Sequence, residues 1–137
     1  MEHQIGMDII AMDQANMDQN WPLLYSLSIA FSKRVESLSF SSNLLAYVTG
    51  NAIADDSPSL DYGTAIAALY HILAFAHLSY STLNTPLIQE RVRYNLRVAN
   101  QSLKNLTVND PALSEILRNR ISVFDTAMEN VGCVRVY

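Results

Sequence analysis

The stretch AIAALYHILAFAHLSY, from Ala65 to Tyr80, decides the fold class of this chain. It is apolar around nearly the whole circumference of a helix, and His71 and His77 are its only side chains that titrate near neutral pH. A helix that is hydrophobic on every side normally lies at the centre of a helical bundle. Sixteen residues are fewer than the roughly twenty that a membrane span requires, and no basic residues flank the stretch. We therefore expect a buried central helix and no membrane span.

Four prolines predict where helices begin: Pro22, Pro58, Pro86 and Pro111 each stand at the head of a helix-like run. Proline suits the first helical turn because its φ is already helical and its missing N–H would have no partner there. Three of the four directly follow a Ser, Thr or Asp, whose side-chain oxygen can accept a hydrogen bond from a free N–H of the first turn.

Apolar residues at helical spacing place the remaining elements. The serine run from Ser37 to Ser42 weakens helix propensity and predicts a break between two helices. The expected helices cover residues 22–39, 43–54, 65–80, 86–106 and 111–130, with residues 1–20 as a short helix or a frayed terminus and residues 133–137 as an extended tail. Short breaks between long helices favour antiparallel neighbours. The expected fold is all-α, a single-domain bundle or stack of helical hairpins over residues 1–137, with about five to six helices.

Charge is scarce and unevenly distributed. The 137 residues include nine Lys and Arg against thirteen Asp and Glu, for a net charge of −4, which disfavours nucleic acid and anionic membranes as partners. Residues 1–62 carry a balance of −6 and residues 63–137 a balance of +2. Either the two halves attract each other, or each presents its own face to a partner.

Cys133 is the single cysteine, so an internal disulfide is excluded and a reducing compartment is the simplest reading. The first residues lack the basic flank and the apolar run of a secretory signal. Both observations lead us to expect a cytoplasmic location.

The histidines do not form a recognisable catalytic or metal-binding pattern. His71 and His77 are six residues apart, about 240° around a helix, so they diverge where a metal-binding pair at i and i+4 would converge. We expect them to be hydrogen-bonded within or at the edge of the core. The sequence has no nucleophile elbow, phosphate loop, dinucleotide fingerprint or Cys-x-x-Cys pair. No cofactor, no metal and no enzymatic activity are therefore expected.

The candidate partner-binding residues lie mainly on the helix that follows Pro86. Arg93, Arg97 and Lys104 share its polar face, and Tyr94 lies at the edge of that face. A nucleic-acid surface would require a basic domain with interleaved aromatics, and this chain has neither. Three interpretations of this basic face remain. It is an ordinary solvated face, or it binds an acidic protein partner, or it contacts the acidic half of this same chain. Trp21 is the further candidate, on the helix that contains Pro22.

One hairpin, roughly residues 67 to 111, has small and apolar residues at a characteristic spacing: Leu73, Ala74, Ala99, Leu103, Leu106 and Pro111. This hairpin resembles a tetratricopeptide repeat, because the last four residues match the end of such a repeat and Leu73 with Ala74 match the packing pair of its first helix. The two helices are farther apart in the sequence than in a standard 34-residue unit. The resemblance implies similarity to small helical adaptors and chaperones, which bind an extended or helical peptide in a groove.

These observations favour a non-enzymatic protein-interaction module, in its most specific form a small acidic chaperone or adaptor that binds another polypeptide. The alternative is a self-assembling homodimer that buries a face with Trp21, Tyr25 or Ile29. A small enzyme with a pocket formed by His71, His77 and a carboxylate is the third possibility.

The basic stripe makes a testable prediction. If Arg93 and Arg97 bind an acidic partner, the double charge reversal Arg93→Glu/Arg97→Glu leaves the circular dichroism spectrum intact and weakens partner capture in a pull-down. Unchanged capture would remove these two residues from the binding surface.

Overall fold

The computed structural model describes residues 2–50, 57–79 and 86–131, and these form five helices with no strand among them. In chain order they are α1 (Glu2–Met17), α2 (Trp21–Thr49), α3 (Ser57–Leu78), α4 (Pro86–Asn109) and α5 (Pro111–Val131). The predicted all-α class is confirmed. No helix in these ranges is long and apolar enough to cross a membrane.

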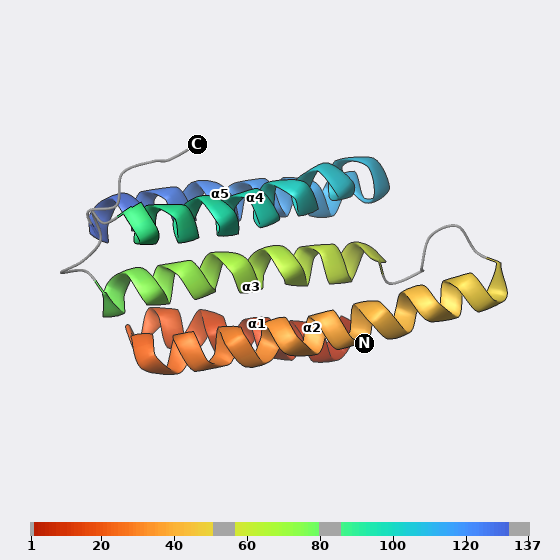
Figure 1. Cartoon of the computed structure of the whole chain (residues 1–137), viewed down its shortest axis with the longest axis horizontal. Helices are drawn as coiled ribbons and strands as arrows, with labels where there is room; N and C mark the ends of the chain where they lie inside the picture. Colours follow the sequence, from red (N-terminus) through yellow and green to blue (C-terminus); the bar gives the residue numbers. More distant parts are fainter. Residues whose placement is uncertain (1, 51–56, 80–85, 132–137) are drawn as a thin grey trace.

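Helix α3 is the centre of the fold. It lies between the pair α1 and α2 on one side and the pair α4 and α5 on the other, and it contacts all four (Figure 1). Ala65, Ile72 and Ala74 on this helix are fully buried. The prediction that the apolar stretch forms the central helix is confirmed.

Gly63 lets α3 approach its neighbours closely. A Cβ atom at this position would lie 3.2 Å from both Phe31 Cζ and Val35 Cγ2 of α2, and 3.6 Å from Ile5 Cγ2 of α1. Phe31 and Val35 are themselves buried, so they have little room to move away. The absence of a side chain at Gly63 therefore determines how closely the central helix packs.

A tight turn joins α1 to α2. Gln19 has a left-handed backbone with φ of 54°, and the N–H of Asn20 donates to the carbonyl of Ala15 at 3.0 Å, which closes the end of α1. Asn20 Oδ1 then accepts from the N–H of Leu23 at 3.3 Å and caps the start of α2. The N-cap of the Pro22 helix is thus Asn20, two residues before the proline.

The connection between α4 and α5 is a single residue, Asp110. Its side chain accepts from the N–H of Leu113 at 3.2 Å, which is the capping interaction that the sequence predicts ahead of Pro111. Thr85, the cap predicted ahead of Pro86, and the tail 133–137 lie outside the described residues.

The predicted break in the serine run is wrong. Helix α2 continues without interruption from Trp21 through Ser37 and Ser42 to Thr49. Each serine costs only about 0.5 kcal/mol of helix propensity, and the run contains neither glycine nor proline. Leu38, within the run, packs against the core and favours the helical path. The helix ends where Gly50 takes a positive φ of 77°, and residues 51–54 of the predicted second helix lie outside the described residues.

The N-terminal segment forms helix α1 from Glu2 to Met17, as the helical alternative for residues 1–20 predicts. Ile5, Ile9 and Met12 of α1 are buried against the core, with exposed fractions of 4%, 7% and 0%. Helix α1 is held by this burial, since a sixteen-residue helix is only marginally stable alone.

Two glycine substitutions test this packing. Gly63→Leu should lower the free energy of unfolding by about 1–3 kcal/mol, because the new side chain must displace Phe31 and Val35.

Gly6, inside α1, has open space around the corresponding Cβ position, so Gly6→Ala should raise the free energy of unfolding by about 0.5–1 kcal/mol. Urea unfolding followed by circular dichroism measures both changes. A Gly63→Leu variant with an unchanged free energy of unfolding would contradict the close approach of α3 to α2.

Candidate functional site

Two grooves flank α3, because its four neighbours form two separate pairs. Helix α1 packs on α2 and α4 packs on α5, whereas α1 and α5, like α2 and α4, do not pack closely together. The α1–α5 groove encloses about 330 Å³ over one side of α3, and the α2–α4 groove encloses about 570 Å³ over another.

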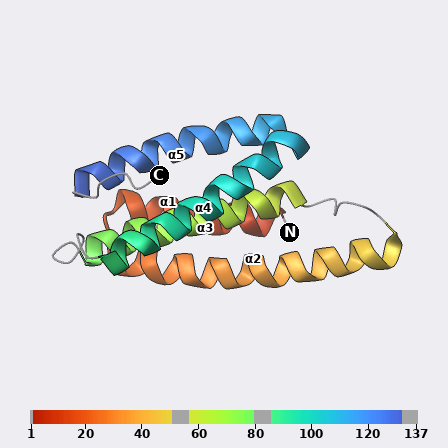
Figure 2. The ribbon, with the colours of Figure 1, turned by 45° about the horizontal axis from the view of Figure 1, so that its top comes forward.

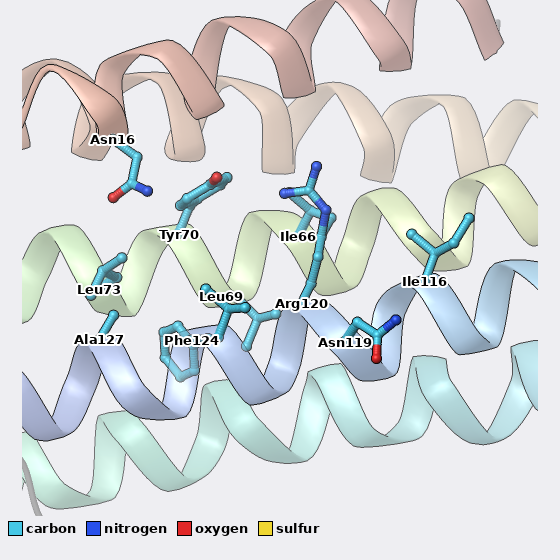
Figure 3. Close-up of a pocket in the computed structure, with 11 residues that line it drawn as sticks. Asn16, Ile66, Leu69, Tyr70, Leu73, Ile116, Asn119, Arg120, Phe124 and Ala127 are labelled. Atoms are coloured by element: carbon cyan, nitrogen blue, oxygen red, sulfur yellow. The ribbon is translucent and has the colours of Figure 1, made fainter.

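The α1–α5 groove has an apolar interior (Figure 3). Its floor is a row of side chains from α3, Ile66, Leu69 and Leu73, which recur at the i, i+3 and i+7 spacing of one helix face. Phe124 and Ala127 of α5 form a wall beside them. The polar groups in the groove come from all three helices: Asn16, Tyr70, Asn119 and Arg120.

An ion pair bridges this groove. Arg120 of α5 donates from Nη1 to Asp13 Oδ1 of α1 at 2.9 Å and from Nη2 to Oδ2 at 3.0 Å. The hydroxyl of Tyr70, on the floor helix, donates to the same Asp13 Oδ1. The two-pronged contact fixes the orientation of both side chains, so it links three helices at one point.

The network shifts the pKa values of its members. Burial alone would raise the pKa of Asp13, but hydrogen bonds from Arg120 and Tyr70 outweigh it, so that pKa lies below its ordinary value of 3.8. The pKa of Arg120 is raised by its hydrogen bonds to Asp13, and the pKa of Tyr70 is raised by burial and by Asp13. At neutral pH the network therefore holds one anion, one cation and a protonated phenol.

Exposed apolar side chains surround the ion pair. Ile10 and Met17 are three residues before and four after Asp13, so they share its face of α1, and they are 65% and 76% exposed. Ile116 and Val123 are four residues before and three after Arg120, so they share its face of α5, and they are 52% and 70% exposed. We call these four side chains the apolar rim of the α1–α5 groove.

The α2–α4 groove is more polar, with Lys33, Glu36, His71 and Tyr94 among its lining residues. His71 Nε2 lies 3.1 Å from Nη2 of Arg91. A guanidinium group can only donate, so His71 accepts through Nε2 and carries its proton on Nδ1. Burial, and then the charge of Arg91, lower the pKa of His71, which favours this neutral form.

His77 has different surroundings. Its ring stacks on Trp21 with the centroids 3.6 Å apart and the planes 4° from parallel, and burial lowers its pKa. His71 instead lies against Tyr25, with the ring centroids 5.0 Å apart. Trp21 and Tyr25 are four residues apart on α2, so both histidines contact aromatic side chains of this one helix, at different points along it. Trp21 is half-buried in this stack.

The structure brings Arg93, Tyr94 and Arg97 together on α4. Both arginines pair with one carboxylate, since Arg93 Nη1 lies 3.3 Å from Glu90 Oε2 and Arg97 Nη2 lies 3.2 Å from Glu90 Oε1. Tyr94 is 60% exposed and lies beside the α2–α4 groove. Lys104, the remaining member of the predicted stripe, is exposed farther along the helix.

Sequence reasoning missed Asp13 and Arg120, although α5 carried a signal. Leu117, Arg120 and Phe124 follow the i, i+3 and i+7 pattern of its buried face, so the arginine is the one charged residue in an apolar row. Such a residue requires a partner of opposite charge, but 107 positions separate it from Asp13. The sequence could have predicted the need for a partner and not its identity.

No cluster of three or more metal-binding side chains occurs among the residues that the structure describes. The chain matches no protein-family model, no curated protein and no solved structure. Function is therefore inferred from the geometry of the chain itself.

A double-mutant cycle tests the bridge across the groove. Asp13→Asn, Arg120→Gln and the double variant should give a coupling energy of about 1–2 kcal/mol at neutral pH, between the values typical of exposed and buried pairs. The folded-state pKa of Asp13 is lowered, so this stabilisation is present above pH 3.8 and is lost as pH falls through the lowered value. Urea unfolding of the four proteins at several pH values measures it. A coupling energy near zero at neutral pH would contradict the bridge.

Proposed function

We propose that this chain is a non-enzymatic protein-interaction module, of the chaperone or adaptor type, that binds an amphipathic helical segment of another polypeptide in the α1–α5 groove. The observation that carries the proposal is the apolar groove lined by the exposed Ile116 and Val123, with Ile10 and Met17 exposed on the face of α1 that carries Asp13. Contiguous exposed apolar surface of this kind is typical of interaction sites.

The dimensions of the groove suit a helix. The residues that line the groove run from Ile116 to Ala127 on α5, which at 1.5 Å per residue is about 17 Å, enough for about three turns of a partner. A partner helix with apolar side chains at i, i+3 or i+4 and i+7 would place one row over the nearly buried Ile66, Leu69 and Leu73, so the exposed rim provides most of the apolar contact area. The rim would contact the flanks of the same row.

The charges at the groove support an apolar partner face. Asp13 and Arg120 neutralise each other at the centre of the groove, so neither sign of charge is favoured there. Asn16 and Asn119 provide amide groups for polar contacts at its edges. The partner is therefore selected mainly by the shape and spacing of its apolar side chains.

The basic stripe is the weaker candidate surface. Arg93 and Arg97 share Glu90, so much of their charge is already compensated within the chain. The groove beside Tyr94 is also more polar, since its lining includes Lys33, Glu36 and His71. This comparison leads us to place the binding site in the groove.

A display library of helical peptides with varied apolar spacing tests the proposal. Selection on the folded protein should enrich amphipathic sequences, and an enriched peptide should bind Val123→Lys at least about tenfold more weakly in fluorescence anisotropy, because the lysine introduces a charge at the rim. Val123 is 70% exposed, so the variant should keep its fold.

The matched control is Val108→Lys, which makes the same change at a position that is 81% exposed on α4 and does not line the groove. Its affinity should stay within about twofold of the parent protein. Failure to enrich any peptide, or equal binding by both variants, would contradict the proposal. If Arg93→Glu/Arg97→Glu abolished binding while Val123→Lys did not, the site would lie on the basic stripe.

A further inference from the structure

Helix α2 carries a second apolar surface, on its C-terminal half. Phe40, Leu44 and Val48 follow one another at intervals of four residues, and their exposed fractions are 71%, 53% and 72%. The spacing places them in one row along the helix. We call this row the α2 stripe.

The stripe is exposed because α2 is longer than the helix beside it. Helix α2 has 29 residues and α1 only 16, and the yellow C-terminal end of α2 extends beyond the other helices (Figure 2). In the described part of the chain, nothing covers the row. The N-terminal part of α2, by contrast, is occupied within the chain: Trp21 stacks on His77 and Tyr25 on His71.

The segment of α2 that carries the stripe is uncharged. No charged residue occurs from Ser37 to Gly50, although the whole chain has a net charge of −4. Two copies of an acidic chain repel each other, and the repulsion is smallest where their charge-free segments meet. A charged partner would find no opposite charge on this segment, whereas the row fits an antiparallel copy of itself, because the large Phe40 lies at one end and the smaller Val48 at the other.

From these observations we propose that two copies of this chain associate through their α2 stripes, crossing antiparallel with Leu44 at the centre. In such a twofold interface the same patch is used on both subunits. Phe40 of one subunit then packs against the partner subunit's Val48, and Leu44 against the partner subunit's Leu44. The large and small ends of the row thus complement each other.

The size of the stripe sets the strength of the dimer. Residues 40–48 span about 12 Å of helix, which is short compared with standard interfaces that bury about 800 Å² on each partner. We therefore expect reversible, concentration-dependent association. The interface is separate from the α1–α5 groove, so a failure of the dimer would not contradict the proposed peptide binding, and the reverse also holds.

Sedimentation velocity from about 1 μM to about 1 mM tests the proposal. The weight-average mass should rise from 15.3 kDa toward about twice that value. Leu44→Glu and Leu44→Lys should each stay monomeric over this range, because each places like charges opposite one another at the twofold axis. An equimolar mixture of the two variants should associate again, since Glu then faces Lys.

Two controls make the outcome specific. Val108→Glu, a similar change at an exposed site away from the stripe, should dimerise as the parent chain does. Circular dichroism should show equal helicity for all variants, since Leu44 is more than half exposed. A monomeric parent chain at every concentration, or a Leu44→Glu variant that still dimerises, would overturn the proposal. Loss of the dimer in Val123→Lys would instead place the contact in the groove.

Discussion

Helix α3 is apolar nearly all round from Ala65 to Leu78, so other helices must cover most of its surface. Two hairpins do this: α1 with α2, and α4 with α5, each closed by a turn of one to three residues. Two hairpins around one cylinder leave a gap on each side where they do not meet. The grooves are therefore a consequence of how the central helix is buried, and its own side chains form their floors.

The contact between Asp13 and Arg120 determines how one of these gaps is held. It joins the acidic first half of the chain to the basic second half, and Tyr70 of the central helix completes it. Apolar packing could bring the hairpins together at several separations, whereas a two-pronged ion pair has one good geometry. The same contact neutralises the charges at the α1–α5 groove. A partner would therefore be recognised through apolar contacts with the floor and the rim.

The unequal lengths of α1 and α2 divide the exposed surface into two regions with different chemistry. The groove is concave, with Asp13 and Arg120 at its centre, and suits an inserted helix. The α2 stripe is convex and uncharged, and suits a copy of itself. The proposals therefore assign a polypeptide partner to the first region and a second subunit to the other.

The sequence by itself determined the helical class, the central position of Ala65–Leu78 and the cap at Asp110, because these depend on periodicity and on neighbours within a few residues. It was misleading at Ser37–Ser42, where tertiary contacts of α2 outweighed a small propensity cost. Only the tertiary structure paired Asp13 with Arg120, stacked Trp21 on His77 and left the rim and the α2 stripe uncovered. The spacing of residues along a helix says which side chains share a face, but which helix meets that face depends on how distant segments pack.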